Sequence, residues 1–310
     1  MRKKPMLDGR QMPRVSEVMH SISLLDELAE HIDEELCYGA LLHGFWGQIA
    51  AYREAVRFYA DNGTNKRNAT HYLWLKSQHQ ELYRDLSDFS TIIYTSQKSN
   101  PNLAVILELF MMILHVWPDE LQRFAGKGGE EEAGRAAASL EEHWARSPEA
   151  RYAVWHAGQV FRNARQMPPT SLRGFNAIAV YFASLTLWIY GLLSCSQPGR
   201  KQEITAGGRG SELVLVDGEE NRDTKAFVQL DRGVPGLMLS GEADAGVEAL
   251  SNPSATLSIA RNVFRENFPI RSEPLPPLVE SLGNLLRDLG SGAGGRPSRV
   301  ASRAVSESPL

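Results

Sequence analysis

The run from residue 175 to residue 193 contains no charged side chain, and it constrains the fold more than any other part of the chain. An uncharged run of this length can cross a membrane as a helix, or it can be the central helix of a large hydrophobic core. Asn176, Ser184 and Thr186 place polar groups within the run. Basic residues lie on both sides of it, so the flanking charges favour neither orientation in a membrane. We therefore expect a buried core helix and no membrane association.

Apolar residues recur at helical spacing along most of the rest of the chain. We expect helices at 148–166 and 171–194 to form the centre of the core, joined by a Met-Pro-Pro-Thr-Ser turn. A capping residue precedes a proline at Asn100, Ser147 and Asn252, which is typical of a helix start. The other expected helices cover residues 15–36, 41–59, 69–94, 101–116, 133–145, 255–268 and 276–289. This pattern predicts an all-α fold, a multi-helix domain of stacked antiparallel helices.

Three parts of the chain lack this helical pattern. Residues 1–14 are expected to form a flexible N-terminus, and the Gly- and Ser-rich residues 290–310 a disordered tail. Residues 198–246 are rich in Gly and charge, and we expect a loop-rich insertion there with one short strand at 213–216. The helical domain itself is expected to span residues 15–289.

A group of acidic and amide side chains follows the expected short strand: Asp217, Glu219, Asn221 and Asp223. Their spacing resembles the first half of a calcium-binding loop. Arg222 stands where such a loop needs Gly, and no Glu closes the loop. We therefore expect a solvated acidic turn and no calcium site.

Composition limits the function of the chain. With 33 basic and 37 acidic residues, the net charge is -4, whereas a nucleic-acid binder usually has a basic excess. The two cysteines, Cys37 and Cys195, fit a reducing compartment and cannot supply a Cys-rich zinc module. The sequence also contains no P-loop and no G-x-S-x-G motif. We expect no enzymatic activity and no cofactor in this chain.

Five residues on or beside the central helix pair are candidate contacts for a partner or an effector. Trp155 and His156 lie on an apolar helix face, where the imidazole can contact a ligand or, as we favour, be satisfied within a helix interface. Arg162, Arg165 and Arg173 flank the turn between the two helices. They can bind an anionic ligand or an acidic partner, but more often such arginines are solvated or tie a loop to a helix end, which we favour.

Two long motifs in the central region, AVWHAGQVFRNAR and PPTSLRGFNAIAVYFASLTLWIYGLL, are unusual in composition. They resemble the C-terminal part of the regulatory, or middle homology, domain of fungal-specific transcription factors of the zinc-finger and zinc binuclear-cluster type. The likeness continues through LVLVDGEE, DRGVPGL and FPIRSEPLPPLVESLGNLLRDLGSG. Together these segments cover about residues 140–292.

This resemblance implies an all-helical regulatory domain in the nucleus that acts on transcription by RNA polymerase II. Its implied partners are the transcription machinery or regulatory proteins, with a homodimer as one oligomeric state. In this family a zinc module reads DNA, and its metal ligands have no counterparts here, because Cys37 and Cys195 are the only cysteines. Zinc and DNA binding are therefore expected only from an N-terminal module that this chain lacks.

The alternative hypothesis is a helical ligand-binding protein or enzyme. Its pocket would lie near four side chains of the central helices: Trp155, His156, Tyr181 and Trp188. The sequence does not pair a nucleophile with a base and an orienting group, so we favour the regulatory domain.

Overall fold

The structure is a computed structural model that describes residues 14–20, 33–61, 68–95, 100–195, 213–241, 246–270 and 274–293. Most of these residues lie in helices, and the strands among them form one three-stranded sheet. The predicted all-α class is therefore confirmed. The predictions for residues 1–13, 198–212 and 294–310 lie outside the described residues. The chain forms two compact units, Met1–Leu114 and His115–Leu310.

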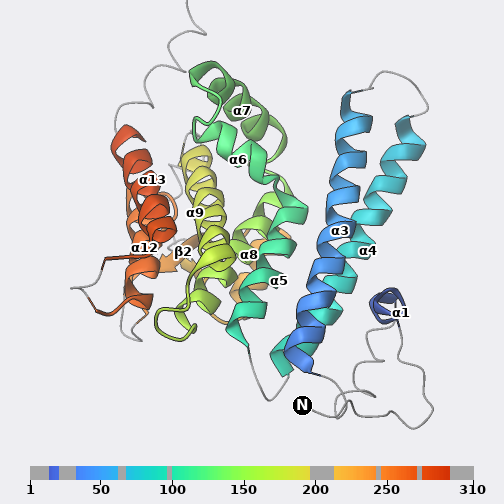
Figure 1. The fold of residues 1–310 in the computed structure, drawn as a ribbon. Helices are drawn as coiled ribbons and strands as arrows, with labels where there is room; N and C mark the ends of the chain where they lie inside the picture. The colour runs from blue at the N-terminus through green and yellow to red at the C-terminus, as the bar shows by residue number, and fades with distance from the viewer. Residues whose placement is uncertain are drawn as a thin grey trace, which may run out of the picture. The chain divides into compact units, whose positions relative to one another are not determined.

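The first unit contains a pair of long helices, α3 and α4, together with α1 and α5 (Figure 1). Their bounds are α1 Val15–His20, α3 Glu34–Asp61, α4 Asn68–Thr95 and α5 Pro101–His115. Between α3 and α4 the core side chains Phe45, Ile49, Leu86 and Phe89 are at most 1% exposed. The ring of Trp46 stacks on that of Phe110, with 5.5 Å between centroids, so α3 also packs against α5.

The expected helix at residues 15–36 differs from the structure. Helix α1 ends at His20, residues 21–32 lie outside the described part, and α3 already begins at Glu34. The carboxylates of Glu34 and Glu35 lie in the first turn of α3, where the helix dipole favours them. Helix α3 also runs without a break through Gly39, which lies in the gap between the expected helices 15–36 and 41–59.

The second unit is built around α9, the uncharged run. Its elements are α6 Pro118–Phe124, α7 Glu130–His143, α8 Pro148–Arg165, α9 Gly174–Cys195, β1 Leu213–Leu215, α11 Arg222–Leu230, β2 Val234–Met238, β3 Val247–Ala249, α12 Pro253–Asn267 and α13 Pro277–Ala293. Helix α9 packs against α6, α8, α12 and α13, and Figure 1 shows α12 and α13 side by side. Helices α8 and α9 correspond to the two expected helices at 148–166 and 171–194, and they pack against each other.

Helix α9 is buried, as the sequence predicted. Along it, Ala179, Val180, Leu185 and Ile189 are completely inaccessible to solvent. By length and composition the helix Gly174–Ser194 could cross a membrane, yet 78% of its most apolar window lies inside the protein. This is the environment of a core helix.

The side-chain caps predicted at three helix starts are present. The Ser147 side chain accepts a hydrogen bond from the amide of Ala150 at 3.1 Å, and that of Asn252 accepts one from Ala255 at 3.3 Å. The Asn100 side chain accepts one from the Asn102 amide at 3.0 Å. Each cap satisfies an amide that has no partner within its own helix.

The expected loop-rich insertion is more ordered than the sequence suggested. The predicted strand is β1, but the same segment also contains α11 and β2. Strand β2 pairs in parallel with β1 and antiparallel with β3, so α11 is the crossover between two parallel strands. At the other end of the domain, α13 continues to Ala293, beyond the expected boundary at residue 289.

Asn221 begins α11 with a capping box. Its side chain accepts hydrogen bonds from the amides of Asp223 and Thr224, both at 2.9 Å, and the Thr224 hydroxyl accepts one from the Asn221 amide. Asn221→Ala is therefore expected to lower the free energy of unfolding by about 1 kcal/mol. Chemical denaturation measures this change. Asn221→Ser, which keeps a capping oxygen, should stay close to the parent protein, and equal losses for Ala and Ser would contradict the capping role.

Candidate functional site

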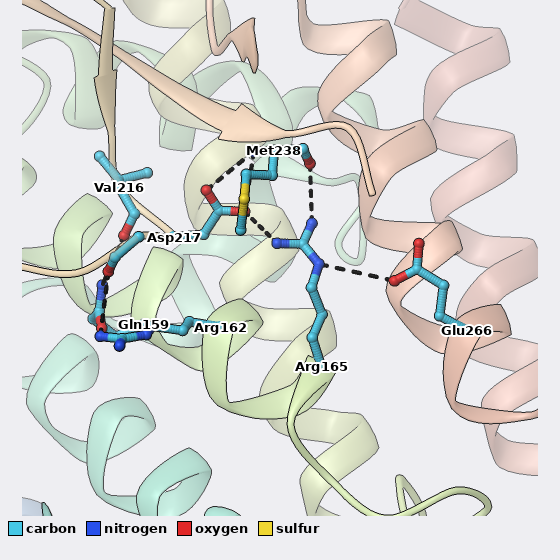
Figure 2. A network of polar contacts seen from close by, with 8 residues as sticks. Gln159, Arg162, Arg165, Val216, Asp217, Met238 and Glu266 are labelled. Atoms are coloured by element: carbon cyan, nitrogen blue, oxygen red, sulfur yellow. Dashed lines mark hydrogen bonds and ion pairs between the residues drawn. The ribbon is translucent and has the colours of Figure 1, made fainter. Parts of the chain in front are cut away.

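A buried polar network joins the C-terminal end of α8 to the small sheet (Figure 2). The guanidinium of Arg165 donates a hydrogen bond to the carboxylate of Asp217 and a second, at 3.0 Å, to the carbonyl of Met238. The Asp217 carboxylate in turn accepts from the Met238 amide, at 3.1 and 3.2 Å from its two oxygens. The side chains of Arg165 and Asp217 are 8% and 0% exposed, so this ion pair is shielded from water.

Two more side chains of α8 extend the network toward the turn after β1. The amide of Gln159 donates to the carbonyls of Val216 and Gly218, both at 2.9 Å. The guanidinium of Arg162 lies 3.0 Å from the exposed carboxylate of Glu219. The spacing of three residues from Gln159 to Arg162 to Arg165 puts all three on one face of the helix. That face holds the segment between β1 and α11.

The electrostatics of the network follow from its burial. Burial raises the pKa of the Asp217 carboxyl, while the Arg165 guanidinium and the Met238 amide act in the opposite direction. A second carboxylate, that of Glu266 on α12, lies 3.9 Å from Arg165 Nε. The guanidinium therefore joins three parts of the unit: the turn after β1, the end of β2, and α12.

The expectation of a solvated acidic turn is wrong for Asp217. This side chain is fully buried because β2 and Arg165 cover it, and neither neighbour is visible in the local sequence. Glu219 is exposed as expected, with its side chain 87% accessible. Asn221 serves as the helix cap described above.

Two glycines let α8 and α9 approach the backbone of neighbouring segments. A Cβ atom added at Gly158 on α8 would lie 2.2 Å from the carbonyl oxygen of Val216. One added at Gly191 on α9 would lie 2.0 Å from the carbonyl oxygen of Leu250, just after β3. Real side chains cannot approach so closely, so only glycine fits at these two crossings.

The other candidate residues lie in different surroundings. His156 is 3% exposed, and its ring is nearly parallel to that of His115 with 6.2 Å between centroids, while Trp155 beside it is half-buried. Arg173 donates to the carbonyl of Thr170 at 2.7 Å and lies 5.7 Å from the ring centroid of Phe268. The structure therefore brings Arg162 and Arg165 together at one network, whereas the contacts of Arg173 and His156 lie elsewhere.

The two remaining residues of the alternative pocket are core side chains. Trp188 is 5% exposed and packs edge-on against Phe124, with 5.7 Å between ring centroids. Tyr181 is 9% exposed, and burial raises the pKa of its hydroxyl. Both side chains contribute to the packing around α9.

The residues that complete the network were not predicted. Gln159, Asp217, Met238 and Glu266 are spread over α8, the turn after β1, β2 and α12. Of these four residues, only Asp217 has a sequence feature that could indicate its position. An apolar run leads directly into it, and an acid directly after a strand can lie at a buried sheet end. Within the described residues, no three His, Cys, Asp or Glu side chains lie close enough together to hold a metal ion.

Comparisons of the chain with models of protein families, with curated proteins and with solved structures found no match.

Proposed function

We propose that the chain is the regulatory domain of a fungal RNA polymerase II transcription factor, which binds partners or an effector in the nucleus. One observation carries this proposal. Arg165 ends the motif AVWHAGQVFRNAR, Asp217 lies in LVLVDGEE, and Met238 directly follows DRGVPGL. These three residues meet in a single network. The segments that resemble the family are thus parts of one folded unit, which is what a shared domain requires.

The chemistry of the network favours a structural role, holding the segments together, over a catalytic one. The Asp217 carboxylate is held by Arg165 and by the Met238 amide, and it lies out of reach of solvent. A general acid or base needs a reacting group within hydrogen-bond distance. We therefore propose a non-enzymatic domain that needs no cofactor of its own, with DNA contact supplied by a zinc module of the family's type. Its proposed partners are the transcription machinery or other regulatory proteins, and a second copy of the chain is one of them.

A tethering assay tests the transcriptional role. The full chain is fused to an unrelated DNA-binding domain in a fungal cell that carries a reporter gene with the matching site. We expect the fusion to raise or lower reporter transcription relative to the DNA-binding domain alone. Glu141→Gln, an exposed change on α7 outside the network, should keep this effect. Reporter output equal to that of the DNA-binding domain alone, from a fusion shown to be folded and bound, would contradict the proposal.

Localisation provides a separate test. We expect the chain, tagged with a fluorescent protein and expressed in a fungal cell, to accumulate in the nucleus. An even distribution between nucleus and cytoplasm would match that of the tag alone. That result would count against a nuclear regulator, whatever the tethering assay shows.

A further inference from the structure

The first unit contains a cavity between α3 and α4 that the regulatory role does not use. Its volume is about 430 Å³, which is within the range of small-molecule sites. The polar and aromatic side chains that line it come from these two helices: Gln48, Tyr52, Trp74, Gln78, Glu81 and Asp85. Met19 of α1, Leu82 and Ala51 add apolar surface. The cavity therefore combines aromatic rings, carboxylates and a small apolar patch.

The two aromatic rings of the cavity offer faces that attract cations. Trp74 is 48% exposed, so its ring is accessible from solvent, and Trp is the best aromatic partner for a cation. The ring of Tyr59 contacts it edge-on, with 6.4 Å between centroids, and this contact holds the indole in place. Tyr52 already has the guanidinium carbon of Arg53 at 5.9 Å from its ring centroid. The Tyr52 ring thus already attracts one cation, the guanidinium of Arg53.

Two carboxylates, Glu81 and Asp85, follow each other one turn apart on α4 and line the same cavity. Burial raises the pKa of the Asp85 carboxyl, and the charges of Glu81 and Asp88 add to this effect while Arg84 opposes it. The Arg84 guanidinium is 3.5 Å from Asp85, but its side chain is 66% exposed, so water screens this pair. The described lining residues include no Lys, Arg or His, although the Arg53 guanidinium and the His79 ring lie against Tyr52. The negative charge of the cavity is therefore only partly balanced.

We propose that this cavity binds an organic cation, an ammonium group carried on a small apolar body. The ammonium would lie between the Trp74 ring and the carboxylate of Glu81, two turns further along the same face of α4, where cation–π attraction and charge pairing act on the same group. Asp85, one turn beyond Glu81, would add negative charge at longer range. The apolar body would contact Leu82 and Ala51. The site lies wholly within the first unit, so this proposal does not depend on the transcriptional role.

Choline is a suitable probe, because its uncharged carbon isostere, dimethylbutanol, has nearly the same shape. Binding to the full chain can be followed by ligand-observed NMR titration. We expect saturable choline binding with a Kd of about 1 mM, as a probe of so few atoms allows, and no saturable binding of dimethylbutanol. Equal binding of both compounds would show an apolar groove and overturn the proposal. So would a lack of saturable choline binding.

Variants then test whether binding occurs in this cavity. Trp74→Leu and Glu81→Gln are each expected to weaken choline binding about tenfold, because each removes one source of attraction for the cation. Trp74→Phe should retain part of the affinity. Tyr72→Leu, on the same helix but outside the lining, and Glu54→Gln on α3 are matched controls that should bind as the parent does. Unchanged affinity in Trp74→Leu and Glu81→Gln, with the melting temperature preserved, would refute the assignment of the site.

Discussion

Replacing Asp217 with Ala is expected to lower the free energy of unfolding by about 3–5 kcal/mol, the usual cost of breaking a buried ion pair. The substitution leaves the Arg165 guanidinium, which is 8% exposed, with only the more distant carboxylate of Glu266, at 3.9 Å, as an ion-pair partner among the described residues. It also removes the acceptor of the Met238 amide. Desolvation of two buried charges offsets much of their attraction, so the intact pair itself adds little net stability. The loss comes from a buried charge without its main partner. Chemical denaturation of the two proteins under the same conditions measures it.

Two further variants separate this cause from a general loss of packing. Glu219→Ala removes a partner of Arg162 at the exposed edge of the network and should cost less than about 1 kcal/mol. Combining Arg165→Met with Asp217→Ala removes the stranded charge, so we expect the double variant to recover much of the lost stability. A double variant no more stable than Asp217→Ala alone would contradict this explanation.

The second large effect is expected at the two glycine crossings. Gly191→Ala would place a Cβ atom 2.0 Å from the Leu250 carbonyl oxygen, and Gly158→Ala one 2.2 Å from that of Val216. The obstructing atoms belong to the backbone, so neighbouring segments must move as a whole to relieve the clash. We expect each substitution to lower the free energy of unfolding by about 3 kcal/mol, at the upper end of typical overpacking costs. The gain of about 1 kcal/mol from the better helix propensity of Ala is too small to offset it.

Gly134 on α7 and Gly283 on α13 are the matched controls. A Cβ atom at either position would meet no atom within 4 Å. Substitution by Ala there should leave stability unchanged or raise it by up to about 1 kcal/mol. Thermal unfolding of the four variants tests the prediction, which fails if the crossing glycines and the control glycines behave alike.

The sequence predicted the helices well because long apolar patterns repeat many times. The expected helices at 148–166 and 171–194 correspond closely to Pro148–Arg165 and Gly174–Cys195. The prolines that follow Ser147 and Asn252 marked two of the helix starts correctly. The side-chain hydrogen bonds of these caps are local, and local chemistry is readable from a few consecutive residues.

The small sheet was largely missed because its strands are short. Strands β1 and β3 each contain three residues, too few for an alternating pattern to stand out. Strand β1 was found since its apolar residues are contiguous, whereas β2 contains Pro235 and Gly236, which normally indicate a loop. Pairing between strands, which the local sequence does not show, stabilises them here.

The contacts of the polar network could not be predicted either, because they join residues that lie far apart in the sequence. Arg162 and Arg165 pair with acidic groups of the same chain, and so tie a loop to a helix end, which is one of the two roles that the sequence left open for them. Asp217 is 52 positions from Arg165 in the sequence, and only the fold brings them together. Whether Trp155, His156 and Arg173 contact a partner remains a prediction.

Native-state hydrogen exchange tests most directly whether the segments that resemble the regulatory family form one cooperative unit. The Val216 amide donates to the Gly236 carbonyl at 3.0 Å, and the Met238 amide donates to Asp217. We predict that both amides exchange with the same opening free energy as the buried amides of α8 and α9. Rapid exchange at Val216 and Met238, with α8 and α9 still protected, would show a sheet that detaches from the helices and would contradict this account.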